Sequence, residues 1–120
     1  MPRFSSILMD HFQEPRNQGL LEHPDRVGIA GTPGAGAFLV LHLQIAGDRV
    51  VDARFQSHGC GVTIACGSVL TDLVIGTAYS ELAHIDTPQL REALGGVPGD
   101  KEHCLRLAIA ALRNAVENQP

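Results

Sequence analysis

Apolar side chains recur at every second position in the middle of the chain. From Phe38 to Ile45 this alternation has the period of a strand with one deeply buried face. The pair Gly47-Asp48 predicts a turn, and Val50 to Phe55 predicts a second strand that completes an antiparallel hairpin. The segment from Arg26 to Ala30 is a candidate for a third strand. The residues expected on the buried face of the first strand are Leu39, Leu41, Leu43 and Ile45.

A short helix is predicted ahead of the strands. Ser5 or Ser6 can cap it, because a serine side chain accepts a hydrogen bond from a free backbone N–H of the first turn. Pro15 blocks its continuation. The stretch 15–25 holds two prolines, an asparagine and a glycine without a clear period, so we expect a connecting segment on the surface. The apolar stripe of the helix would be Ile7, Leu8 and Phe12.

Three further helices are predicted after the strands. The first runs from Val62 to Ile75 and ends at Gly76, and the second, short one runs from Thr87 to Leu94. The last helix is capped by Asp100 and its apolar face extends to about Val116. Strands followed by helices predict an α+β fold, in which a small antiparallel three-stranded sheet packs against helices as a two-layer sandwich.

Composition narrows the classes of protein that need to be considered. With 120 residues and 44% hydrophobic content, residues 1–120 can form a single domain with one core and no disulfides. Three cysteines without a paired spacing indicate a reduced, cytoplasmic compartment. No window approaches the roughly 20 apolar residues of a membrane helix, so no membrane partner is expected. A net charge of −4 and an aromatic content of 4% argue against nucleic acid as a partner.

Candidate chemistry lies at two places. Cys60 stands between two glycines in a predicted strand-to-helix turn, where the backbone can adopt positive φ and leave the thiol uncrowded. His103 and Cys104 lie at the start of the last helix, where free backbone N–H groups and the helix dipole favour the thiolate, the form that binds metal. The loop from Gly31 to Ala37 is permissive enough to approach such a site but carries no donor of its own.

The other thiol and the other histidines have simpler interpretations. A free cysteine is among the residue types most often buried, and Cys66 falls inside a predicted helix between Ala65 and Gly67, so we interpret it as packing. Most of the remaining histidines show no mutual spacing that indicates a site. His58 is the one among them that precedes Cys60 closely.

Four stretches of the chain have a recognisable pattern: DHFQEPRNQG at Asp10–Gly19, GTPGAG at Gly31–Gly36, VVDARFQSHGCGVTIACGS at Val50–Ser68 and KEHCLRLAIAAL at Lys101–Leu112. The first and third are the most specific of the four. Together they resemble the iron-sulfur cluster assembly scaffolds of the IscU and NifU N-terminal domain group. They occur in the order of that family and span most of the chain.

The resemblance implies a scaffold, not an enzyme, on which sulfur and iron are assembled before transfer. Its site comprises three cysteines, an aspartate and a histidine beside the last cysteine. By position, the second cysteine is Cys60, and the histidine and third cysteine are His103 and Cys104. The first cysteine and the aspartate correspond to Ala35 and Ala37, so two ligands are replaced by methyl groups.

Cys60, His103 and Cys104 would fill three of the four positions around a tetrahedral zinc or iron. Cys66, His58, water or a second subunit could supply the fourth. A cluster bridged between two chains would need only two thiolates from each, which would make the protein a homodimer.

Three hypotheses of function remain open at this stage. The chain is a scaffold or carrier that binds an iron-sulfur cluster, iron, or zinc in its place; or a degenerate scaffold that docks to a cysteine desulfurase or an apo iron-sulfur protein without holding a cluster; or a sulfur-transfer protein whose thiol accepts a persulfide. The family's chaperone-recognition stretch L-P-P-V-K is replaced by the less hydrophobic Val97-Pro98-Gly99-Asp100-Lys101, so we do not expect recognition by a dedicated chaperone.

Overall fold

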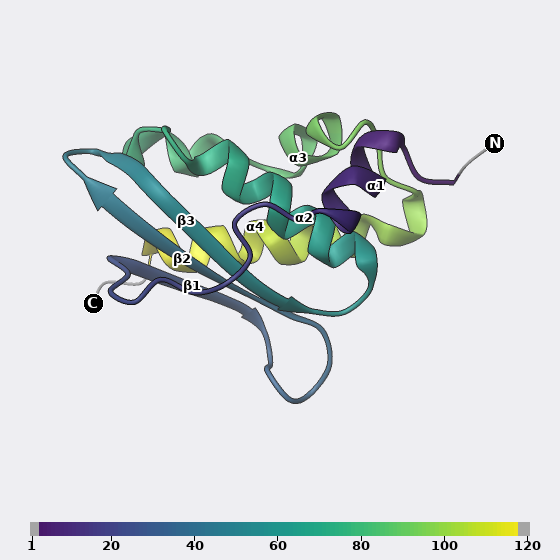
Figure 1. The fold of residues 1–120 in the computed structure, drawn as a ribbon, viewed down its shortest axis with the longest axis horizontal. Helices are drawn as coiled ribbons and strands as arrows, with labels where there is room; N and C mark the ends of the chain where they lie inside the picture. Colours follow the sequence, from purple (N-terminus) through teal and green to yellow (C-terminus); the bar gives the residue numbers. More distant parts are fainter. Residues whose placement is uncertain (1–2, 118–120) are drawn as a thin grey trace.

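The computed structural model describes residues 3–117 and contains one three-stranded antiparallel sheet (Figure 1). Its strands are β1 (Arg26–Gly31), β2 (Phe38–Ala46) and β3 (Arg49–His58), hydrogen-bonded in the order β1-β2-β3. The predicted hairpin and the third strand are therefore confirmed. The strand β3 is longer than the apolar pattern indicated, and its last residue, His58, lies just ahead of the glycine that precedes Cys60.

Helices cover one face of this sheet, as predicted for an α+β two-layer fold. The helix α4 packs over β1 and β2, and α2 packs over β3 beside it. The short helix α1 lies against α2 and adds to the helical layer. The helices are α1 (Ser6–Gln13), α2 (Gly61–Val74), the 3₁₀ helix η1 (Tyr79–His84), α3 (Thr87–Ala93), the 3₁₀ helix η2 (Gly99–Lys101) and α4 (Glu102–Glu117). The turn η1 was not predicted.

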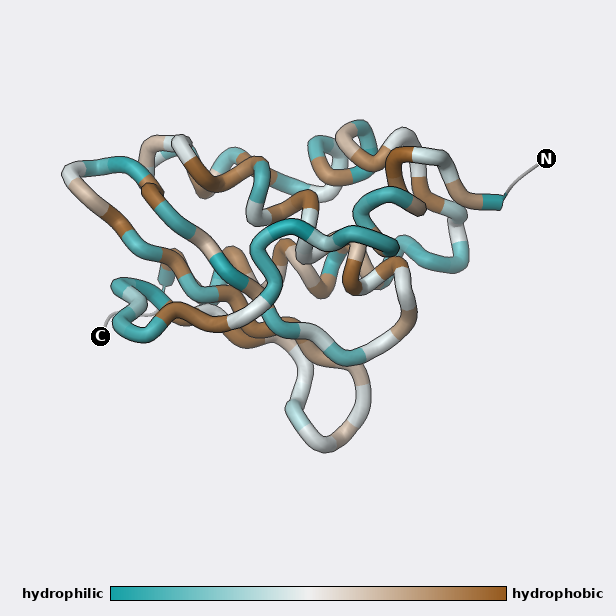
Figure 2. The backbone as a smooth tube through the Cα atoms, viewed as in Figure 1, coloured by the Kyte–Doolittle hydropathy of each residue, from teal (hydrophilic) through white to brown (hydrophobic). Residues whose placement is uncertain are grey.

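The buried core lies between the sheet and the two long helices. Because successive side chains of a strand point to opposite faces, the alternating leucines of β2 all point into it. Figure 2 shows hydrophobic positions along the strands and on α2, and hydrophilic positions on the segment that crosses β3. The core residues from the sheet include Leu39, Leu41, Leu43, Ala53 and Phe55, none of which has an exposed side chain.

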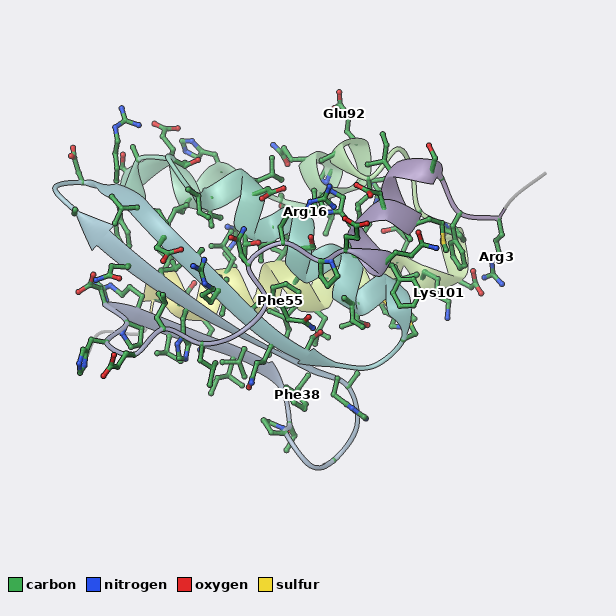
Figure 3. All side chains as sticks on the ribbon, in the orientation of Figure 1. Arg3, Arg16, Phe38, Phe55, Glu92 and Lys101 are labelled. Carbon is green, nitrogen blue, oxygen red and sulfur yellow. The ribbon has the colours of Figure 1, made fainter. Side chains whose placement is uncertain are left out.

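The predicted cap of the last helix is wrong. Asp100 lies inside η2, and α4 begins only at Glu102. The Asp100 carboxylate accepts a hydrogen bond from the Arg3 guanidinium instead of capping the helix. The first turn of α4 is tied to α3 by a two-pronged ion pair, in which Arg91 donates to both Glu102 carboxylate oxygens. Figure 3 shows Arg3 and Lys101 at this end of the molecule.

The first helix is capped as predicted but is less buried than its stripe indicated. The Ser5 hydroxyl accepts a hydrogen bond from the Leu8 backbone N–H, and Leu8 is buried. Ile7 and Phe12 are 48% and 39% exposed. The connecting segment then follows the edge of β3, where the backbones of Asn17 and Gly19 both bond to Phe55. None of the helices within residues 3–117 combines the length and apolarity that crossing a membrane requires.

Gly28 should be essential for the contact between α4 and the sheet. A Cβ atom at this position would lie 2.0 Å from the Ala111 carbonyl oxygen, a backbone atom that cannot move aside. We therefore expect Gly28→Ala to lower the free energy of unfolding by about 1–3 kcal/mol, the usual cost of overpacking a core. Denaturant unfolding measures this change.

Gly99→Ala is the matched control for the Gly28 variant. A Cβ atom at Gly99 would meet no atom within 4 Å, so this variant should unfold at the midpoint of the unmodified protein. Equal midpoints for all three proteins would contradict the packing described for α4.

Candidate functional site

Cys60 lies in the turn that joins the central sheet to α2. The turn opens at Gly59, whose φ of 149° is unfavourable for residues with a side chain, and Cys60 is the N-cap residue of α2 in an extended conformation. The residue is partly buried, and it lines an open pocket at the surface. The sequence prediction of a thiol in a strand-to-helix turn is confirmed.

Cys104 lies in the first turn of α4 and faces inward. Only 1% of the residue is exposed. Its Sγ atom lies 3.7 Å from the Sγ atom of Cys60, although the two residues are 44 positions apart in the chain. The two helices thus bring together two of the three residues predicted for the site.

The hydroxyl of Thr63 links the two sulfur atoms. It donates a hydrogen bond to Cys104 Sγ over 3.5 Å and lies 3.8 Å from Cys60 Sγ. Thr63 belongs to the first turn of α2 and is almost completely buried. The pair of thiols is therefore held by a polar side chain from the same helix end that carries Cys60.

The two thiols differ in their readiness to ionise. Burial alone would raise the pKa of Cys60, but the backbone N–H groups of Thr63 and Val62 and the Thr63 hydroxyl together hold that pKa below the ordinary value. Burial raises the pKa of Cys104, the nearby Cys60 raises it further, and the Thr63 hydroxyl offsets only part of this. Cys60 is therefore the thiol that ionises more readily. The expectation that the start of the last helix favours the Cys104 thiolate is wrong, because burial of this side chain raises its pKa.

His103 is adjacent to Cys104 in the sequence but not in its surroundings. Neighbouring residues on an α-helix point about 100° apart, so His103 is exposed while Cys104 is buried. Within residues 3–117, no group of three or more His, Cys, Asp or Glu side chains is gathered closely enough to hold a metal ion. The ligand role of His103 stays a prediction.

The loop that resembles the remainder of the family site ends beside Gly59, the residue that precedes Cys60. Residues 31–37 are all exposed, and positive φ angles at Gly34 and Gly36 shape the loop. The methyl group of Ala37 lies 3.5 Å from the place that a Cβ atom on Gly59 would occupy. Ala37 is therefore in the immediate neighbourhood of Cys60, but it offers no ligand atom. Figure 3 shows Phe38, the first residue of β2, at the base of this loop.

The two residues named as alternative ligands have other contacts. Cys66 has no exposed surface, and burial is the largest cause that raises its pKa, which agrees with the packing interpretation. His58 is exposed at the end of β3, where its ring stacks on Phe38 with centroids 6.0 Å apart.

An apolar pocket opens beside Cys60 and was not predicted. It has a volume of about 280 Å³ and is formed where α1 meets the start of α2. The signal in the sequence was the apolar stripe of α1, because Phe12 of that stripe lines the pocket and packs against the position of Gly61. Its lining residues are Phe4, Leu8, Met9, Phe12, Cys60, Gly61, Val62 and Lys101.

Removing the hydroxyl of Thr63 should weaken the ionisation of Cys60. In Thr63→Val, the pH at which iodoacetamide alkylates Cys60 at half its maximal rate should rise, because the hydroxyl that helps to lower the pKa of Cys60 is removed. Thr63→Ser keeps the hydroxyl and should retain the low midpoint. The measurement is the pH dependence of alkylation, followed by peptide mass spectrometry. An unchanged midpoint in Thr63→Val would contradict the described role of the hydroxyl.

Comparison of the sequence with known proteins finds a family and several relatives. The family described as NifU-like N terminal domain matches residues 3–120. The chain is 39% identical to "Iron-sulfur cluster assembly scaffold protein IscU 1" of Archaeoglobus fulgidus, over 94% of this chain and 74% of that protein. It is 33% identical to "Iron-sulfur cluster assembly scaffold protein IscU" of Haemophilus influenzae, over 94% of this chain and 92% of that protein.

A solved structure shows the same fold. The crystal structure of a putative iron-sulfur cluster assembly scaffold protein for the SUF system from Fervidobacterium islandicum superposes with a TM-score of 0.73 over 95% of this chain and 96% of that chain. With 20% identity, this likeness concerns the fold alone. The family match and the two relatives show more than the fold. The chain belongs to the IscU/NifU-like family of iron-sulfur cluster assembly scaffolds.

Proposed function

We propose that this chain is a scaffold or carrier that binds an iron-sulfur cluster, iron, or zinc as its cargo through Cys60, Cys104 and His103. The observation that carries this proposal is the 3.7 Å separation of the Cys60 and Cys104 sulfur atoms. The relatives named as IscU scaffolds support the same assignment.

The two thiols have the chemistry that such cargo requires. Thiolates are the preferred ligands of iron-sulfur clusters and are common ligands of zinc. Cys60 stands at the N-terminus of α2, where the backbone N–H groups of Thr63 and Val62 and the Thr63 hydroxyl lower its pKa. Binding would draw the proton from Cys104, whose pKa is raised in the free protein, so affinity for metal should increase with pH.

The remaining coordination positions must be filled from outside the thiol pair. His103 is exposed two residues into α4 and is the candidate from the same chain. A second copy could supply two more thiolates and bridge a cluster between two chains. A cysteine desulfurase as the sulfur source and apo iron-sulfur proteins as recipients complete the proposal.

Anaerobic reconstitution with ferrous iron and sulfide tests this function. The desalted protein should retain both and show a visible absorption band of an iron-sulfur cluster. Cys60→Ser and Cys104→Ser should each lose the cluster, because each removes half of the thiolates. Cys66→Ala is the matched control and should retain it, since Cys66 is buried away from solvent. Cluster retention in both serine variants would exclude this site.

The second candidate function is that of an interaction module, a degenerate scaffold that docks to a cysteine desulfurase or an apo iron-sulfur protein. It is favoured by the alanines that stand at positions 35 and 37 of the loop in place of ligands, and by the lack of a third gathered ligand within residues 3–117. Under this proposal the chain docks to a cysteine desulfurase without holding a cluster.

The double variant Cys60→Ser/Cys104→Ser separates the two functions. An interaction module should bind a purified cysteine desulfurase with unchanged affinity when both thiols are removed, because docking needs a surface and not a ligand set. Isothermal calorimetry measures this affinity. No binding by the unmodified protein, together with a stable reconstituted cluster, would exclude the module.

A further inference from the structure

The thiol pair has an outer and an inner member. Cys60 is partly exposed in a glycine-flanked turn, whereas Cys104 is 1% exposed and lies directly behind it. A sulfur donor can therefore reach Cys60, and the nearest thiol to any group placed on Cys60 is Cys104. This order of access, with a short separation, is the arrangement of an attacking and a resolving thiol.

We propose that the pair converts a persulfide on Cys60 into free sulfide, with Cys104 as the resolving thiol. This activity rests on the proposed handling of sulfur at the same site. The substrate class is a persulfide, delivered by a small molecule or by a protein cysteine.

The step balances without an added reductant. The Cys104 sulfur attacks Cys60 Sγ, so a Cys60–Cys104 disulfide bond forms and the bond from Cys60 Sγ to the outer sulfur breaks. The outer sulfur leaves with the bonding electron pair and takes up the proton that Cys104 gives off, which yields hydrogen sulfide. The outer sulfur is reduced by two electrons, and the two cysteine thiols are oxidised to the disulfide. A further turnover needs a dithiol reductant to reopen that disulfide.

The geometry favours this step over storage of the persulfide. The sulfur atoms must close from 3.7 Å to about 2.05 Å, a movement within reach of side-chain rotation. The turn around Cys60 contains Gly59 and Gly61, which carry no side chains to obstruct it. The Thr63 hydroxyl contacts both sulfur atoms and positions Cys104 towards Cys60.

Loading with an alkyl persulfide under anaerobic conditions tests the proposal. After loading, a sulfide-selective electrode should record one sulfide released per chain. Peptide mass spectrometry should find the Cys60–Cys104 disulfide, with the loss of two hydrogen atoms from the protein mass. Cys104→Ser should keep the persulfide on Cys60 and release no sulfide above background, and Cys104→Ala checks the same loss if the serine variant folds poorly.

Cys66→Ala is the matched control, because it removes a thiol that lies in the core away from solvent, and it should release sulfide like the unmodified protein. A persulfide as long-lived in the unmodified protein as in Cys104→Ser would overturn the proposal. Sulfide release without a Cys60–Cys104 disulfide would overturn it as well, because another thiol would then supply the electrons.

The outcome is independent of the scaffold test, because reconstitution there uses inorganic sulfide and needs no persulfide. A protein that assembles a cluster but retains its persulfide would overturn this inference alone. A protein that releases sulfide but retains no iron would overturn the scaffold function alone.

Discussion

The close approach of two helices to one sheet determines the rest of this structure. The α4 backbone at Ala111 contacts β1 so closely that only glycine fits at position 28, and α2 meets the Phe55 ring of β3 at Gly67 with the same lack of space. These contacts fix the position of each helix relative to the strand that it packs against. Because both helices begin at the same end of the sheet, their first turns come together, and so do the thiols carried there (Figure 1).

This convergence gives two chemically identical side chains different properties. The pKa of Cys60, at the rim, is lowered by the nearby backbone N–H groups of Thr63 and Val62 and by the Thr63 hydroxyl, which together outweigh its partial burial. Cys104 projects towards the core, where burial penalises the thiolate. The ion pair between Arg91 and Glu102 ties the first turn of α4 to α3, and Cys104 lies within the core cluster of buried side chains. The pair is thus asymmetric in access and in charge for the same structural reason.

Periodic features of the fold could be predicted from the sequence, and features that depend on distant residues could not. The alternation through Leu39 and Leu41 and the glycine after α2 identified the hairpin and a helix end correctly, because both signals are local. Asp100 was misassigned as a cap because its partner, Arg3, is distant in the sequence. The adjacency of His103 and Cys104 in the sequence does not indicate how far each side chain is buried, because burial depends on how α4 packs against α2 and the sheet. The apolar pocket beside Cys60 requires α1 and α2 to be placed together before it exists.

A site of two thiols beside a loop without ligands has a physical consequence for any cargo. Two thiolates fill half of a tetrahedral coordination shell, and the exposed loop at Ala35 and Ala37 contributes only backbone and methyl groups. The rest of the shell around a metal or cluster held there would have to be filled by the exposed His103, by solvent or by a second protein. Coordination positions filled by solvent would favour exchange of the metal or cluster over permanent retention. An incoming protein could add its own ligands there before the two thiolates dissociate. With methyl groups at Ala35 and Ala37, this loop offers such a cargo no side-chain ligand.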